Sequence, residues 1–298
     1  MNALVSLFDS VYRFYKGLSP GIYGQNWFLA VGFGIFFFGL VWAVEKVYGT
    51  RTDNYRSRNF VHDLVYWFYA RSSLHYFLFM AAIVAAIKGP LGFIDPPPAT
   101  RLPFALQVVV FVLLNDFCYY WMHRALHHYK FLWAFHAIHH SQEKITLVSG
   151  ARFHPLETFA TNLLIYIPLR IAGFDALIWL PLTLVLMVQI EIEHTQIPWR
   201  FGPLYRVMVS PVFHSYHHAV DPSFRDKHFG QTFAFWDHLF GTAVKGVSAL
   251  PTRFGVEGVK PRSFWDTLVI PFSLLRAYYG TPSARQAPAK TSLPAHQD

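Results

Sequence analysis

Long stretches without a charged residue constrain the fold of this chain more than any other feature. Trp27–Val44 is eighteen residues long and carries no charge. That is about the length an α-helix needs to cross the hydrocarbon core of a membrane. Leu102–Met122 has the same character, except for Asn115 and Asp116 near its end. Polar groups at such depth are costly unless they face a cavity or a partner.

Two further segments have the same apolar character. Phe60–Ile87 is interfacial in its first half and largely apolar from Leu74 onward. Leu156–Ile192 is 37 residues long and is interrupted near Gly173, so it fits either two spans or a helical hairpin that enters and returns. We therefore expect an all-α integral membrane protein with about four to five transmembrane or hairpin helices and a cytoplasmic helical cap that carries a histidine-rich site.

The overall composition excludes several other classes of protein. Hydrophobic residues make up 53% of the chain and charged residues 14%, against roughly 25% charged in an average soluble domain. The net charge is +8, but Lys and Arg are scattered among apolar runs and form no basic stripe, which argues against nucleic acid as a partner. Cys118 is the single cysteine, so neither an intrachain disulfide nor a thiolate pair can form.

Charge and composition also suggest an orientation and a division of the chain. Arg51, Arg56 and Arg58 outnumber Arg13 and Lys16 across the first span, which places the former group and the later histidines on the cytoplasmic side. We expect N-terminal membrane helices over 1–101, a catalytic domain over 102–245 and a C-terminal segment over 246–298. Met1–Lys16 resembles an amphipathic surface helix rather than a signal peptide, and Thr281–Asp298 resembles a disordered tail.

Histidine is abundant, with sixteen residues, and most of them are clustered at helical spacing. His123 and His127 are four residues apart, which places both rings on one helix face. His136-Ala-Ile-His139-His140 and His214-Ser-Tyr-His217-His218 each place three rings within an arc of about 100°. His194 follows the long apolar hairpin and is expected at the same membrane depth. The candidate metal ligands are His123, His127, His136, His139, His140, His194, His214, His217 and His218.

This set is too large for one metal ion. A tetrahedral zinc takes four ligands, so eight or nine histidines indicate a two-metal centre. Asp116 lies on the helix stripe that also carries His123 and His127, where a carboxylate can accept a ring N–H and orient a ligand. His154 precedes a proline that can begin a helix, and it is a candidate ligand, pocket residue or helix cap. His228 and His238 fit either a supporting role behind the ligands or a surface role.

These motifs resemble those of the fatty acid hydroxylase superfamily, also called the sterol desaturase family. The resemblance covers about Val108–Thr242 and rests on the histidine boxes, on Arg152-x-His154-Pro155-x-Glu157 and on Phe235-Trp236-Asp237-His238-Leu239-Phe240-Gly241-Thr242. It adds Glu157 and Asp237 to the residues expected around the metals. The sequence departs from the usual pattern at His228 and His238, and neither position lies in a histidine box.

The resemblance implies a membrane-bound, non-haem di-iron oxygenase with two iron ions and with O2 as co-substrate. The substrate would be a lipid, such as a sterol or a fatty acyl chain, that enters from the bilayer. No nicotinamide, flavin or haem-attachment motif is present, so a separate electron donor resembling cytochrome b5, a ferredoxin or a reductase is implied. The membrane would be the inner membrane in a bacterium or the endoplasmic reticulum in a eukaryote.

Other functions remain open at this stage. A membrane zinc hydrolase or transferase acting on a lipid could use part of the same cluster. A metal transporter is less compatible with the pattern, because it would need ionisable residues through the middle of the spans. The sequence does not distinguish hydroxylation from desaturation, although the resemblance favours hydroxylation.

Overall fold

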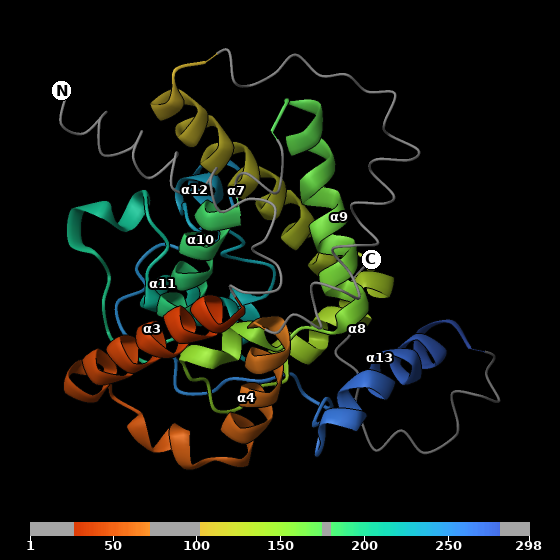
Figure 1. Ribbon diagram of the computed structural model, residues 1–298. Coiled ribbons are helices and arrows are strands. Elements are labelled where there is room, and N and C mark those ends of the chain that lie inside the picture. The colour runs from red at the N-terminus through yellow and green to blue at the C-terminus, as the bar shows by residue number, and fades with distance from the viewer. Residues whose placement is uncertain (1–26, 72–101, 175–179, 281–298) are drawn as a thin grey trace.

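The computed structural model describes residues 27–71, 102–174 and 180–280, and these residues form helices and connecting loops without a β-strand (Figure 1). The predictions for Met1–Lys16, for the apolar part of Phe60–Ile87 and for Thr281–Asp298 fall wholly or mostly outside the described residues. The helical class expected from the sequence is thus confirmed for the described part of the chain.

Helix α7 (Phe104–His128) is the longest of the described helices, and its C-terminal end carries the first of the predicted ligand histidines. It has 25 residues, and an 18-residue window within it has a mean hydropathy of 1.5, so it is long and apolar enough to cross a membrane; it is the one such helix found among the described residues. The predicted span over Leu102–Met122 lies in this helix, which continues for six residues beyond Met122 and so carries His123 and His127. The expected four to five membrane helices and the cytoplasmic cap are not established by this finding.

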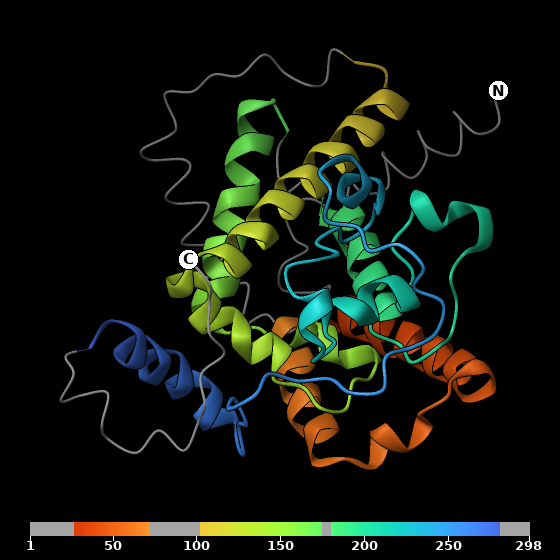
Figure 2. The ribbon, with the colours of Figure 1, turned by 180° about the vertical axis from the view of Figure 1, so that it is seen from behind.

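Helix α9 (Pro155–Ile171) lies beside α7 in both views (Figures 1 and 2). Phe111 of α7 is fully buried against Leu169 of α9 and Phe174, in a core of large apolar side chains. α9 begins at Pro155, where the missing backbone N–H costs nothing. It ends before Gly173, whose φ of 88° favours glycine. Helix α10 (Leu180–Glu193) follows, so the long apolar stretch forms two separate helices.

Helix α8 (Lys130–His140) begins almost directly after α7 and carries the first histidine triplet. One face of α8 packs against α13 (Phe264–Tyr279), with Ala137 and Ile138 fully buried in the contact. From the sequence we expected only a C-terminal segment over 246–298 and assigned no element to it. α13 is therefore an addition to the predicted fold, and it fixes α8 from the side opposite the histidines.

Helices α3 (Trp27–Tyr48) and α4 (Arg58–Arg71) support the other side of the centre through the short 3-10 helix η4 (Leu147–Ala151). Trp67 of α4 packs against Leu147 and Val148 in a buried apolar cluster. Behind this cluster, the buried Arg152 guanidinium donates to Asp63 at 2.5 Å. The arrangement anchors the loop that joins α8 to α9.

The second histidine triplet lies on a short helix, α11 (Pro211–His217), with His218 as its last, capping residue. The Ser210 hydroxyl caps α11 by accepting from the Phe213 N–H at 3.2 Å. The remaining short elements are η1 (Thr52–Arg56), η5 (Gly202–Arg206), η6 (Pro222–Phe224) and α12 (Phe235–Leu239). α11 packs against α10, which places its histidines close to His194.

Candidate metal centre

The nine histidines predicted as metal ligands lie together in two buried groups. Within each group, one ring nitrogen from every member lies within 4.8 Å of the corresponding nitrogens of the others. The first histidine group is His123, His127, His136, His140 and His217, and the second histidine group is His139, His194, His214 and His218. No other group of this kind occurs among residues 27–71, 102–174 and 180–280.

Four separate segments supply these rings. α7 contributes only to the first group, and the residue that follows α10 contributes only to the second. α8 and α11 contribute to both, because neighbouring residues such as His139 and His140 point to different groups. The i, i+3, i+4 spacing therefore places three rings on one helix face and divides them between two points.

In the first group, the Nε2 atoms face one another. His140 Nε2 lies 3.1 Å from His127 Nε2 and 3.2 Å from His136 Nε2. Two nitrogens that each lie about 2.1 Å from one metal ion are about 3 Å apart when the angle between them is near 90°. The spacing in this group is therefore that of nitrogens that share one ion.

Two other rings of the first group, those of His123 and His217, bind carbonyl acceptors through Nδ1, and this fixes their protonation. His123 Nδ1 lies 2.9 Å from the Phe229 carbonyl, and His217 Nδ1 lies 2.8 Å from the Lys227 carbonyl. Because a carbonyl can only accept, each Nδ1 carries the hydrogen and each neutral ring has a bare lone pair at Nε2. Both Nε2 atoms are buried without a hydrogen-bond partner, an arrangement that costs free energy unless a cation is bound.

In the second group one ring, His194, has its Nδ1 bound to a carbonyl in the same way, whereas the Nδ1 atoms of His139, His214 and His218 are buried without a hydrogen-bond partner. His194 donates from Nδ1 to the Ile190 carbonyl at 2.7 Å, which leaves its Nε2 lone pair 3.1 Å from His214 Nε2. His218 Nε2 lies 3.0 Å from the same atom. The fourth ring, His139, stacks on Phe153 with ring centroids 4.4 Å apart, which fixes its plane. The donors in both groups fit transition-metal ions.

Burial also sets the protonation of the rings outside α7. Desolvation, followed by the repulsion of neighbouring histidines, lowers the pKa of His139, His140 and His217 well below 6.5. Burial lowers the pKa of His194 to about 4. These imidazoles are therefore neutral at neutral pH, which is the form that binds metals.

The residues expected around the ligands occupy different roles. Glu157 is buried and accepts from His136 Nδ1 at 2.6 Å, so it orients that ring directly. Asp116 does not accept a ring N–H from a metal-ligand candidate as expected; it accepts from the backbone N–H groups of Thr232 and Phe233 at 2.8 and 3.1 Å. The reason is that the loop after Phe229 folds back onto α7 and offers backbone donors closer to this carboxylate.

Asp237 supports the same loop from its other end. Its two carboxylate oxygens accept from the Phe229 and Gly230 N–H groups at 2.7 and 2.8 Å. The Phe229 carbonyl in turn accepts from His123. Asp237 therefore acts on the first group indirectly. It binds the peptide unit between Phe229 and Gly230, whose carbonyl accepts from the His123 ring.

His228 and His154 lie outside both groups. His228 donates to the Phe213 carbonyl at 2.7 Å and accepts from the Val244 N–H at 2.8 Å, while its ring stacks on Phe213. It fixes the loop whose carbonyls bind His123 and His217. His154 caps α9 by accepting from the Leu156 N–H at 3.1 Å, so of its three expected roles the structure shows the cap.

Several supporting groups gave no signal in the sequence. The carbonyls of Lys227 and Phe229 orient two rings, but a backbone group cannot be identified by residue type. Asp226 places a carboxylate oxygen 3.4 Å from His127 Nδ1, and its side chain is 51% exposed. Gly150 lies against His194, where an added Cβ would be 2.8 Å from Nδ1. An Asp and a Gly in a loop are too common to be selected by pattern alone.

Replacing Glu157 by glutamine should weaken metal binding about 10- to 100-fold, the usual effect of removing a partner that orients a ligand histidine. The amide keeps the shape but removes the negative charge that fixes the His136 tautomer. The measurement is competition with a chelator for the purified protein. Glu143→Gln, at an exposed carboxylate that pairs with Lys260, is the control, and equal affinities in the two variants would contradict the assigned role.

Replacing Asp237 by asparagine should have a smaller effect on metal and a clear effect on stability. The asparagine places an NH2 group where one carboxylate oxygen was, and this group faces a backbone N–H. A buried N–H donor thus loses its acceptor, which costs about 1–3 kcal/mol of stability. The expected result is a lower unfolding temperature of the metal-free protein, measured by differential scanning fluorimetry. An unchanged unfolding temperature would show that the loop does not depend on this carboxylate.

Fold and site together define a helical protein with a buried, histidine-rich centre suited to two metal ions. Residues 108–242 match the fatty acid hydroxylase family model. The resemblance based on the histidine boxes is confirmed for this part of the chain. The matched residues contain all nine histidines of the two groups.

Similar proteins include several lipid-modifying enzymes. The ornithine lipid hydroxylase OlsE of Rhizobium tropici is 30% identical over 171 residues, which cover 57% of this chain and 52% of that protein. Human alkylglycerol monooxygenase is 33% identical over 127 residues (43% of this chain, 28% of that protein). The very-long-chain aldehyde decarbonylase GL1-8 of Oryza sativa subsp. indica is 30% identical over 142 residues (46% of this chain, 51% of that protein).

The chain therefore spans about half the length of these curated relatives, or less. No solved structure matches it significantly.

Proposed function

We propose that this protein is a membrane-bound, non-haem di-iron oxygenase that hydroxylates a C–H bond of a lipid. The observation that carries the proposal is the division of nine buried histidines into two groups with metal-ligand spacing. The names of the relatives support a lipid substrate, and two of the three, a hydroxylase and a monooxygenase, favour hydroxylation over desaturation.

Iron is proposed from the chemistry of the donors. Imidazole suits iron, and the described residues offer no thiolate cluster that would favour other metals. Two bound irons would supply the activation of O2 and the oxidation of an unactivated C–H bond. The protein's part is to hold the rings in place, through Glu157 and the Phe229 and Lys227 carbonyls, and to exclude water by burying all nine rings.

The location follows from the apolar surface. Large apolar side chains are exposed on α3, α7, α9 and α13, among them Phe36, Val109, Leu164 and Trp265. Many large apolar side chains exposed together on one molecule support contact with a membrane or a partner. We place the protein in a membrane with the histidine groups on the cytoplasmic side, in the inner membrane of a bacterium or the endoplasmic reticulum of a eukaryote.

Electrons are proposed to come from a separate one-electron carrier. The exposed basic residues Arg200, Arg206 and Arg225 lie in the segment between α10 and the Phe229 loop, with Lys227 next to them. They could meet an acidic carrier or anionic head groups.

The test combines metal analysis with isotope labelling. Detergent-purified protein should contain about two iron ions per chain, as in other two-metal sites. Cells that express it under 18O2 should contain a lipid with one added 18O atom, absent when His217 is replaced by alanine. One zinc per chain with an O2-independent change in lipids would instead support the hydrolase or transferase alternative.

A further inference from the structure

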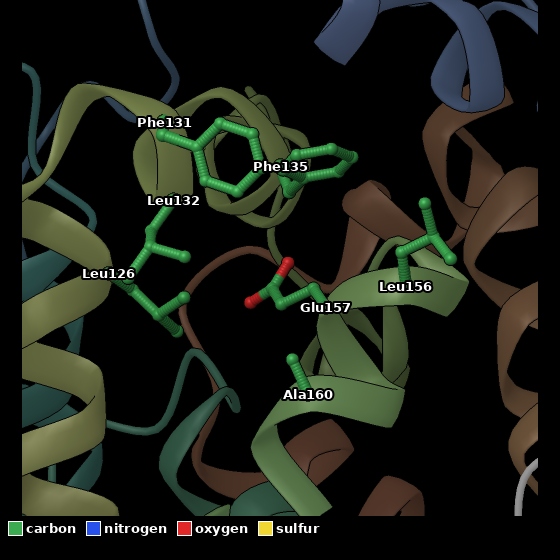
Figure 3. Close-up of a pocket in the computed structure, with 7 residues that line it drawn as sticks. All are labelled: Leu126, Phe131, Leu132, Phe135, Leu156, Glu157 and Ala160. Carbon is green, nitrogen blue, oxygen red and sulfur yellow. The ribbon is translucent and has the colours of Figure 1, made fainter.

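A cleft of about 130 Å³ lies between three helices next to the first histidine group (Figure 3). α7 contributes one lining residue, and α8 and α9 contribute three each. The lining residues are Leu126, Phe131, Leu132, Phe135, Leu156, Glu157 and Ala160. The cleft is separate from the ring Nε2 atoms that face one another in the first group, because the Glu157 carboxylate and the His136 ring lie between.

The lining selects an apolar ligand. Six of the seven residues are hydrophobic, and Figure 3 shows the Glu157 carboxylate between Leu126, Leu132 and Ala160. One oxygen of this carboxylate accepts from His136, and the other is buried without a hydrogen-bond partner. A ligand with several polar groups would leave them unsatisfied here. A hydrocarbon chain has no hydrogen bonds to lose on binding, and it would bury apolar surface.

The mouth of the cleft lies on apolar surface. Two of its lining residues, Phe131 and Leu156, are 53% and 48% exposed, which is high for large apolar side chains. On one side Phe135 contacts Phe272 of α13, with ring centroids 5.7 Å apart, and Phe272 is itself half exposed. On the other side the cleft adjoins α7, the helix long enough to cross a membrane. The medium that best fits such a mouth is the hydrocarbon of a bilayer.

We propose that this cleft binds the aliphatic chain of a membrane lipid, with the inner part of the chain against Glu157. The proposal rests on the proposed function for the lipid nature of the substrate, and it gives that lipid an anchoring position. The carbon that reacts would lie elsewhere on the lipid, since the Glu157–His136 pair separates the cleft from the facing Nε2 atoms. The volume admits only a short part of a chain.

The experiment uses the full chain in nanodiscs that contain a phosphatidylcholine with a diazirine near the end of one acyl chain. After irradiation and digestion, mass spectrometry should find labels concentrated on the residues that line the cleft, above all Leu126, Leu132 and Ala160. An excess of the same lipid without the diazirine should reduce this labelling in the wild-type protein. The metal-free protein should give the same pattern.

Ala160→Phe should fill the cleft. Each methylene kept out of an apolar site is worth roughly a factor of four in binding, so exclusion of two should lower labelling at Leu126 and Leu132 more than tenfold. Ala172→Phe adds the same bulk at an exposed position at the end of α9 and should leave the labelling unchanged. Both variants should elute as the wild type does on size exclusion.

Labels spread evenly over the exposed apolar residues of α7 and α13, without enrichment at the cleft, would overturn the proposal. So would labelling that persists in Ala160→Phe, or the absence of any competed label in the wild type. Because the measurement needs neither metal nor turnover, it separates failure of this proposal from failure of the proposed oxygenase function. Loss of iron or of 18O incorporation, with cleft labelling intact, would count only against the latter.

Discussion

Replacing His136 or His217 by alanine is expected to abolish the proposed oxygenase activity and to remove bound metal. Both rings belong to the first histidine group, and each has its Nδ1 hydrogen committed to a buried acceptor. Loss of a residue that only orients a ligand already costs about 10- to 100-fold in metal affinity or activity, so loss of a ligand should cost more. Metal per chain, measured by plasma mass spectrometry, should fall below about two.

The matched control is His128→Ala. His128 is on the same helix as His123 and His127, but it is exposed, packs on Tyr129 and belongs to neither group. Its replacement should leave metal content and activity at the wild-type level. All variants should insert into membranes normally, because the apolar contact between α7 and α9, such as that of Phe111 with Leu169, does not involve the rings. Full activity in His136→Ala or His217→Ala would refute the assignment of these rings as ligands.

A single methyl group at Gly150 should have an effect almost as large. A Cβ at this position would lie 2.5 Å from Ile190 Cγ2 and 2.8 Å from His194 Nδ1. Both are side chains of one rigid helix end, so the ring must turn away from the second group or the backbone must shift. Overpacking of this kind costs about 1–3 kcal/mol. The expected outcome is a metal content below about two ions per chain together with loss of activity.

Gly39→Ala is the control for this prediction, because a Cβ there meets no atom within 4 Å. It should change neither metal content nor activity. Retention of two metals in Gly150→Ala, with the His194 Nδ1 still bonded to Ile190 in a structure of the variant, would show that the loop can yield without moving the ring.

Spacing selected eight of the nine residues that form the two groups, because helical periodicity is a short-range property; His194 was selected by its place after the long apolar stretch. His136, His139 and His140 share a face through their positions in the chain, whatever the rest of the fold does. The division of the nine rings between two points was not predictable. It depends on how α8 and α11 approach each other, and that is set by packing against α13 and α10.

The roles of the carboxylates were harder to predict. Asp116 lies on the expected stripe of α7, yet its partners come from a loop more than a hundred residues away. Glu157 was included through a family motif and not through any local pattern, and its contact with His136 is visible only in three dimensions. Helix α13 was not predicted, and its role depends on its packing against α8, which is visible only in three dimensions.

The pairs His139–His140 and His217–His218 divide neighbouring residues between the two groups. The centroids of His140 and His217 are 4.5 Å apart, as are those of His140 and His218, so the two helices meet ring against ring. An ion in one group would therefore fix both backbones that present ligands to the other. The conformational entropy lost on ordering those ligands would then be lost when the first ion binds and not again when the second binds. Metal titration of the empty protein should accordingly be cooperative, with few singly loaded molecules at half saturation.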